Sequence, residues 1–185
     1  MLKKFKMSAK NLTTTRGLVL SAMFLAIFAV LGIFKIPIPP AALQNRLTLT
    51  FAATAAAAMV LGPVPAMIVG GCGDILGYML NQGGGAYFPG FTISAMLAGL
   101  LYGIFLYQRD KKHMLWWTML AVFVITLFVN MVLNTFWLSV MYAKAYSFFA
   151  IERIIKNIIA YPIHVIVIFA LYMLIEKTGI RKKYQ

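Results

Sequence analysis

Long apolar stretches recur along almost the whole of this chain, and no other feature limits its possible folds as strongly. A helix crosses the hydrocarbon core of a bilayer in about 20 residues. Six stretches approach that length, at residues 17–34, 47–62, 64–80, 91–107, 114–138 and 151–175. Their apolar residues run continuously and do not alternate with polar ones, which favours helices over the strands of a membrane barrel.

These stretches predict an all-α membrane protein, a compact bundle of six transmembrane helices that forms one domain over residues 1–185. A basic leader, 1–16, precedes the bundle and a basic tail, 176–185, follows it. With 62% hydrophobic and 11% charged residues, the composition is incompatible with a water-soluble globular domain. A cleaved signal peptide is an alternative for the N-terminus, but no small-residue cleavage site is evident before Lys35 and five further apolar stretches follow.

Basic residues are unevenly distributed between the segments that would connect the six helices. If the helices alternate in direction, one side of the membrane carries Lys3, Lys4, Lys6, Lys10, Arg16, Arg109, Lys111, Lys112, Lys177, Arg181, Lys182 and Lys183. The positive-inside rule places that side, with both termini, in the cytoplasm, and the protein in the plasma membrane. The formal net charge of +13 is therefore explained by topology and does not indicate nucleic-acid binding.

Polar and aromatic residues interrupt the apolar pattern where the fifth stretch ends. Asn130 and Asn134 are four residues apart and share one side of a helix, which Trp137 continues. A buried Asn offers donors and acceptors to the edge of a heterocycle, and Trp offers a flat face for stacking. In the structural alternative, Trp137 belongs to the interfacial aromatic belt and the Asn side chains join neighbouring helices.

A basic cluster follows at the start of the sixth stretch, where Arg153, Lys156 and Asn157 share a helical face. The two cations match the carboxylates of an anionic ligand, because Arg forms bidentate hydrogen bonds with such groups. In the alternative, Lys156 pairs with Glu152 and both basic side chains extend toward lipid headgroups. The cluster predicts either a ligand contact or a headgroup contact.

Asp74 lies near the middle of the third stretch, and a carboxylate inside a membrane is by default a functional candidate. It would accept hydrogen bonds from the N–H groups of a ligand or pair with a buried base such as Arg46. The single Cys and the two His residues are scattered, so the sequence predicts no metal site and no cofactor.

Small residues four apart occur in the first apolar stretch, at Ala22 and Ala26, and the pattern continues to Ala29. Such a strip lets another helix approach closely. The approaching helix is either one of this chain's own or one from a partner subunit.

Two segments carry a resemblance to a known family: "YFPGFTISAMLAGLLYGIFL" (87–106) and "VNMVLNTFWLSVMYAKAYSFFAIERIIKN" (129–157). With the six spans and the small-residue strip, they resemble the folate-specific branch of the substrate-binding (S) components of energy-coupling factor (ECF) transporters. The resemblance implies capture of folate or reduced folates outside the cell and toppling within the membrane to release them inside. It also implies a transmembrane coupling subunit that grips Ala22 and Ala26, and two ABC-type ATPases that drive it.

The same resemblance assigns roles to individual residues. Stacking on the pterin falls to Trp137 with Tyr87 or Phe88, and hydrogen bonds to its edge fall to Asn134 and Asp74. The glutamate carboxylates of the ligand would be held by Arg153, Lys156 and Arg46. Segments 36–46 and 81–90 would gate the site.

Three other functions remain as alternatives. The first is an S component for a different vitamin, such as riboflavin, pantothenate or thiamine. The second is a membrane scaffold protein without a small-molecule ligand. The third, an intramembrane enzyme, is disfavoured because the sequence offers no nucleophile with a base and no Gly-x-Ser-x-Gly motif. A phosphate-binding G-x-x-x-x-G-K-[ST] motif is also missing from the sequence, so ATP-driven uptake would require ATPase partners.

Overall fold

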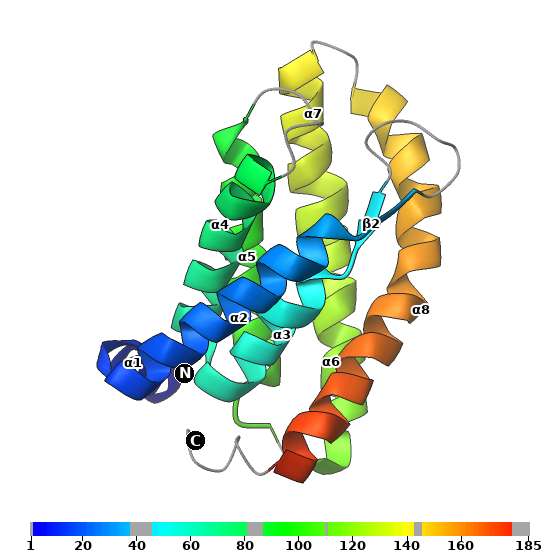
Figure 1. Ribbon diagram of the computed structural model, residues 1–185. Coiled ribbons are helices and arrows are strands. Elements are labelled where there is room, and N and C mark those ends of the chain that lie inside the picture. The colour runs from blue at the N-terminus through cyan, green and yellow to red at the C-terminus, as the bar shows by residue number, and fades with distance from the viewer. Residues whose placement is uncertain (1, 38–45, 81–86, 110, 143–145, 179–185) are drawn as a thin grey trace.

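The computed structural model describes residues 2–37, 46–80, 87–109, 111–142 and 146–178, which form a bundle of helices (Figure 1). Within these ranges, five helical segments are long and apolar enough to cross a membrane: Thr15–Ile33, Pro63–Leu80, Pro89–Leu106, Lys111–Met141 and Arg153–Thr178. The predicted helical class is therefore confirmed, and the described strands amount to one short pair.

The first half of the chain contains four helices and this pair of strands. In chain order they are α1 (Leu2–Thr13), α2 (Thr15–Ile33), β1 (Lys35–Pro37), β2 (Arg46–Thr48), α3 (Thr50–Leu61) and α4 (Pro63–Leu80). The two strands are antiparallel, with Ile36 opposite Leu47. Thr14 separates α1 from α2 and caps α2, because its hydroxyl accepts a hydrogen bond from the backbone N–H of Gly17.

The second half contains the longer helices. They are α5 (Pro89–Leu106), the 3-10 helix η1 (Lys111–His113), α6 (Met114–Val124), the π-helix η2 (Ile125–Leu133), α7 (Asn134–Tyr142) and α8 (Tyr146–Thr178). The segments α6, η2 and α7 follow one another without a break and form one long rod (Figure 1). Pro162 lies inside α8, where its ring removes one backbone hydrogen bond.

The structure adds to the sequence-based prediction in one place and differs from it in another. Most of the basic leader, 1–16, forms the helix α1. The second predicted span, 47–62, is replaced by β2 and the 12-residue α3. At 1.5 Å per residue α3 is about 18 Å long, which is shorter than the hydrocarbon core of a bilayer. Parts of the predicted connecting segments, residues 38–45, 81–86 and 143–145, lie outside the described residues.

The helix α3 lies at the centre of the bundle and contacts α2, α4, α5 and α8. Every residue from Ala52 to Leu61 is buried. A helix that is surrounded on all sides is apolar all round, and small side chains let its neighbours approach closely. The run of alanines that makes this segment a weak candidate for a membrane span therefore suits it to the interior of the bundle.

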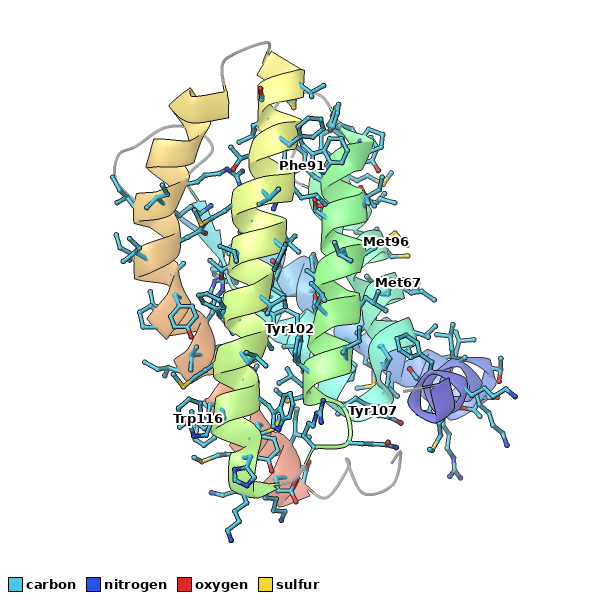
Figure 2. The ribbon with its side chains drawn as sticks, turned by 180° about the vertical axis from the view of Figure 1, so that it is seen from behind. Met67, Phe91, Met96, Tyr102, Tyr107 and Trp116 are labelled. Atoms are coloured by element: carbon cyan, nitrogen blue, oxygen red, sulfur yellow. The ribbon has the colours of Figure 1, made fainter. Side chains whose placement is uncertain are left out.

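The helices α4 and α5 pack with their backbones in near contact. A Cβ atom on Gly99 would lie 2.3 Å from the carbonyl oxygen of Ala66, so no side chain fits there. Figure 2 shows Met67 on α4 and Met96 on α5 on the same outer side of this pair. The crossing point is thus fixed by a glycine rather than by interlocking large side chains.

The helix α1 is attached to the corner between α3 and α4. The Ser8 hydroxyl, which is fully buried, donates to the carbonyl of Leu61 at 3.2 Å and accepts from the N–H of Val64 at 3.1 Å. Gly62 turns this corner with φ of +98°, a conformation that favours glycine. As a result α1 lies at the same end of the bundle as the last turn of α8 (Figure 1).

Candidate ligand-binding site

A pocket of about 280 Å³ opens within the bundle, on the side of α3 that is nearer to β2. Residues of α2, β2, α3, α4, α5, the π-helix η2, α7 and α8 contribute to it. Its lining consists of Phe28, Thr48, Thr50, Phe51, Thr54, Gly70, Asp74, Phe91, Ala95, Ala98, Tyr102, Ile125, Asn130, Asn134, Arg153, Lys156, Asn157, Ala160 and His164. Such a concentration of polar groups inside an apolar bundle marks the pocket as the candidate site.

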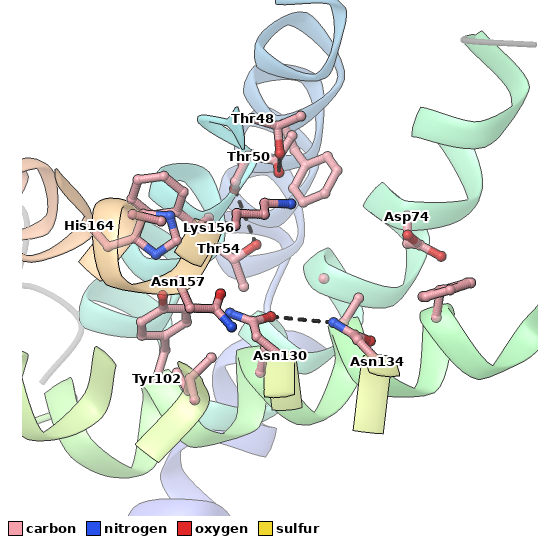
Figure 3. Close-up of a pocket in the computed structure, with 18 of the residues that line it drawn as sticks. Thr48, Thr50, Thr54, Asp74, Tyr102, Asn130, Asn134, Lys156, Asn157 and His164 are labelled. Atoms are coloured by element: carbon pink, nitrogen blue, oxygen red, sulfur yellow. Dashed lines mark hydrogen bonds between the residues drawn. The ribbon is translucent and has the colours of Figure 1, made fainter. Parts of the chain in front are cut away.

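The π-helix carries part of the polar wall (Figure 3). The side-chain amide of Asn134 donates to Oδ1 of Asn130 at 3.3 Å. The Arg153 guanidinium donates through Nη1 to the backbone carbonyl of Asn130 at 2.9 Å. Segments of π-helix are rare in proteins, but those that occur are often found at functional sites. Their wider turns alter the positions of side chains and carbonyls. Here the altered segment is tied to the basic start of α8.

Two buried polar atoms in this wall have no hydrogen-bond partner among the described residues: Oδ1 of Asn134 and Nδ2 of Asn157. One is an acceptor and the other a donor, and both residues line the pocket. Leaving such a group unsatisfied costs about 1–3 kcal/mol. A ligand that presents a donor to one and an acceptor to the other would remove that cost.

Charges of opposite sign lie on different sides of the pocket. Lys156 from α8 and Asp74 from α4 are well separated in Figure 3, and Arg153 lies one turn before Lys156 on α8. The ring of His164 stacks on that of Phe51, with the ring centroids 3.8 Å apart. The α8 side therefore suits an anionic group, and the α4 side suits a group that donates hydrogen bonds.

Asp74 is held by a chain of hydroxyl groups. The Thr92 hydroxyl donates to Oδ2 of Asp74 at 2.8 Å, and the Tyr87 hydroxyl lies 2.7 Å from the same Thr92 oxygen. Thr92 is buried, and the Tyr87 ring also contacts the ring of Tyr78. The carboxylate is thereby oriented by α5, and its predicted pairing with Arg46 lies outside what the structure describes, because nothing is described of that side chain.

Trp137 lies beside the pocket and does not belong to its lining. Its indole N–H donates to the hydroxyl of Ser94 at 3.1 Å, and a Cβ atom on Gly90 would lie 2.5 Å from the indole ring. The ring of Phe88 is 5.7 Å away, centroid to centroid. Trp137 is therefore packed against the start of α5 as one member of an aromatic cluster.

The predicted site residues thus fall into groups. One pocket is lined by Asp74, Asn134, Arg153 and Lys156. Beside this pocket, outside its lining, lie the aromatic side chains of Tyr87, Phe88 and Trp137. On α2, Ala22 and Ala26 are exposed and Ala29 is half-buried.

The lining also contains residues that the sequence did not single out. These are chiefly Thr48, Thr50 and Thr54 near the start of α3, and the aromatic residues Phe28, Phe51 and Tyr102. Two of the threonines were available as a signal, since Thr50 and Thr54 interrupt the apolar pattern four residues apart, a spacing that suits one helical face. In the described ranges, no group of three or more His, Cys, Asp or Glu side chains is placed to hold a metal ion.

Comparison with known proteins gives concordant results. The family described as the S component of the ECF-type riboflavin transporter matches residues 12–177. The folate transporter FolT of Clostridium novyi (strain NT) is 39% identical over 138 residues, which cover 75% of this chain and 78% of that protein. FolT of Leuconostoc mesenteroides subsp. mesenteroides is 33% identical over 157 residues, covering 82% and 81% respectively.

Two solved structures share the fold. A crystal structure of FolT bound with folic acid has a TM-score of 0.74 and 32% identity, and the match covers 89% of this chain and 95% of that one. The S component of a bacterial ECF transporter has a TM-score of 0.68 and 27% identity, with coverage of 87% and 95%.

The fold and the pocket together define a helical membrane protein with a polar ligand site inside its bundle. The chain belongs to the family of S components of ECF transporters. This confirms the resemblance found in the sequence, and it makes the chain a transporter subunit rather than an enzyme.

Proposed function

We propose that this chain is a folate-specific S component, which captures folic acid or reduced folates from outside the cell. Two FolT relatives and a FolT structure with folic acid support this ligand. The pocket volume of about 280 Å³ is close to the lower end of the usual range for small-molecule sites, which begins near 300 Å³.

The observation that carries the proposal is the combination of polar groups on the α7–α8 side of the pocket. An acceptor on Asn134 and a donor on Asn157, neither with a hydrogen-bond partner in the described ranges, lie in the same wall as the cations Arg153 and Lys156. Folate combines a heterocycle whose edge has donors and acceptors with a glutamate whose carboxylates are anionic. Amide groups and cations in one pocket match both parts.

Individual roles follow from this match. Asn134 and Asp74 bind the pterin edge, and Arg153 and Lys156, with Arg46, bind the glutamate carboxylates. Trp137 with Tyr87 or Phe88 remains the proposed stacking group for a ligand that reaches beyond the pocket toward the start of α5. The oriented carboxylate of Asp74 supports its assignment to N–H groups of the ligand.

The proposal also covers the assembly. The chain forms one domain, 1–185, with six helices in the plasma membrane, α3 being the shortest, and with both termini in the cytoplasm. A transmembrane coupling subunit contacts α2 at Ala22, Ala26 and Ala29, and two ABC-type ATPases supply the energy. The exposure of Ala22 and Ala26 supports this contact, and α1 and the last turn of α8 at one end support the common side of the termini.

The first test is a titration of the purified full-length chain in detergent with folic acid, followed by tryptophan fluorescence and calorimetry. We expect saturable binding of one ligand per chain, weakened in Arg153→Ala and in Trp137→Ala. Folded protein that binds neither folic acid nor reduced folates would refute the ligand assignment. Unchanged affinity in Arg153→Ala alone would remove that residue from the site.

Riboflavin is the second candidate, because the family that matches residues 12–177 is described by that vitamin. Riboflavin has no carboxylate, so its binding would gain little from Arg153 and Lys156. A competition panel with riboflavin, pantothenate and thiamine against folic acid separates these ligands. Complete absence of binding across the panel would favour a scaffold role.

A further inference from the structure

A second cavity lies on the outside of the bundle, between α6 and α8, and differs in character from the polar pocket. It is a groove of about 340 Å³ lined by Trp116, Trp117, Met119, Leu120, Phe123 and Tyr161. Tyr161 carries the one hydroxyl among these side chains, and that group is already engaged: it donates to the backbone carbonyl of Met119 at 3.2 Å. The interior of the groove is therefore apolar.

Specific contacts fix the walls of this groove. The Tyr161–Met119 hydrogen bond joins α8 to α6 across it. On the other side, the Arg109 guanidinium lies 3.6 Å from the centroid of the Trp117 ring and donates to the carbonyl of Phe105 at 3.2 Å. The groove is thus bordered by a hydrogen bond between α8 and α6 on one side and by the Arg109–Trp117 contact on the other.

The outward face of α6 continues the groove as a stripe. Trp116, Leu120 and Phe123 are spaced by four and three residues, which places them on one side of the helix. Trp116 is 71% exposed, Leu120 44% and Phe123 54%. Figure 2 shows Trp116 at the outer side of the bundle, near the end that also holds Tyr107. In a membrane protein such a stripe faces lipid chains, with Trp at the interface.

A basic residue precedes the stripe, at the end that begins with Trp116. Lys112 in η1 lies one turn before Trp116 and is exposed. Its neighbours are otherwise engaged, since Lys111 forms an ion pair with Glu176 at 2.5 Å and Arg109 stacks on Trp117. The order along α6 is thus a cation, an indole and then an apolar channel, which is the order of headgroup, interface and chain in a phospholipid.

We propose that the groove between α6 and α8 binds one acyl chain of an anionic phospholipid, with Lys112 paired to its phosphate. A linear hydrocarbon chain suits a shallow apolar channel that runs along a helix. The negative headgroup is selected by charge complementarity with Lys112, and each such contact near a membrane surface favours the anionic lipid about fivefold. The site is separate from the polar pocket and holds a component of the bilayer.

The test is native mass spectrometry of the purified full-length chain, released from detergent after addition of phosphatidylglycerol or phosphatidylcholine with identical acyl chains. We expect the wild-type chain to retain one phosphatidylglycerol about fivefold more than one phosphatidylcholine. Lys112→Ala should reduce phosphatidylglycerol retention to the level of phosphatidylcholine. Leu120→Trp, which fills the groove, should lower retention of both lipids.

Two variants serve as matched controls. Leu115→Trp adds the same bulk at another exposed position of α6, outside the groove, and Lys6→Ala removes the same charge from α1. Both should retain lipid as the wild type does. Equal retention of the two lipids by the wild type, or equal losses in Leu115→Trp and Leu120→Trp, would overturn the proposal. Wild-type retention in Lys112→Ala would overturn the role given to the cation.

Discussion

The two halves of α3 have opposite surroundings. Thr50, Phe51 and Thr54 line the pocket, whereas every residue from Ala55 to Leu61 is packed against other helices and buried. The same division runs through α8, where the pocket-lining residues from Arg153 to His164 are followed by the packed residues Ile168 and Tyr172. The bundle thus has a polar end, where these two helices line the pocket, and a dry end, where their residues are packed against other helices.

This contrast shows how one bundle separates stability from binding. At the dry end, close backbone contact and small side chains fix the helices. At the polar end, groups without a hydrogen-bond partner among the described residues, such as Asn157 Nδ2, cost folding energy that a ligand can recover. Substitutions at the dry end should therefore change the free energy of unfolding, and substitutions at the polar end should change the affinity for the ligand.

The largest effect is expected at the crossing of α4 and α5. Gly99→Ala places a Cβ atom against the backbone carbonyl of Ala66, which cannot rotate away, so we expect a loss of about 3 kcal/mol in unfolding free energy. Thermal unfolding in detergent measures it. Gly77→Ala is the matched control, since its Cβ would lie 3.9 Å from Phe28, an ordinary contact. Equal melting temperatures for the two variants would show that the crossing is not fixed at Gly99.

The next effect tests the cationic wall. Arg153→Ala should weaken folic acid binding by roughly 1.5–3 kcal/mol, the usual range for a hydrogen bond to a charged group. Calorimetric titration measures this change in the binding free energy. Arg16→Ala removes the same side chain from an exposed position on α2 and should leave affinity unchanged. Similar losses in both variants would indicate a general charge effect instead of a site.

A third substitution is expected to separate binding from stability at the polar end. Asn157→Leu removes a buried donor that has no partner in the described part of the chain, so the melting temperature without ligand should hold or rise. Affinity for folic acid should fall by about 1–3 kcal/mol.

Asn11→Leu should give the opposite pattern, since the Asn11 amide donates to the Leu61 carbonyl at 3.3 Å, far from the pocket. It should lower the melting temperature and leave affinity unchanged. If Asn157→Leu instead destabilised the protein and bound normally, the role of Asn157 would be structural.

The smallest effect concerns the attachment of α1. Ser8→Ala removes two hydrogen bonds to the corner between α3 and α4, and we expect a loss of about 1 kcal/mol in unfolding free energy with unchanged affinity. Thr13→Ala, at an exposed hydroxyl on the same helix, is the comparison. A melting temperature equal to that of the wild type would mean that the two hydrogen bonds of Ser8 contribute nothing to stability.

Much of this arrangement was predictable from local pattern. Long apolar runs identified most of the helices, because membrane-spanning helices are specified by composition over about 20 residues. Asp74, Asn134, Arg153 and Lys156 were identifiable because polar groups are rare inside a membrane, and the structure brings all four to one pocket.

The remaining features depend on long-range contacts that the local pattern does not contain. The burial of α3 on all sides follows from the helices packed around it, and the helix in the leader is attached to residues more than fifty positions away. Trp137 was predicted to stack on a ligand because of its type, but its position beside the pocket is set by Gly90 and Ser94. The π-helix has no recognisable sequence signature here, since its residues are those of an ordinary apolar helix.

That π-helix has a consequence for how this chain tolerates change in length. Wide turns across Ile125–Leu133 accommodate more residues than an α-helix of the same rise. A one-residue deletion there would remove the surplus residue from the wide turns and leave α7 in nearly the same orientation, whereas a one-residue deletion within α6 would rotate α7 by about 100°. Asn134 and Trp137 would keep their directions in the first case and turn away from their neighbours in the second. Comparing ligand binding by single-residue deletions in the two segments would therefore show whether the site depends on helix length at this point of the chain.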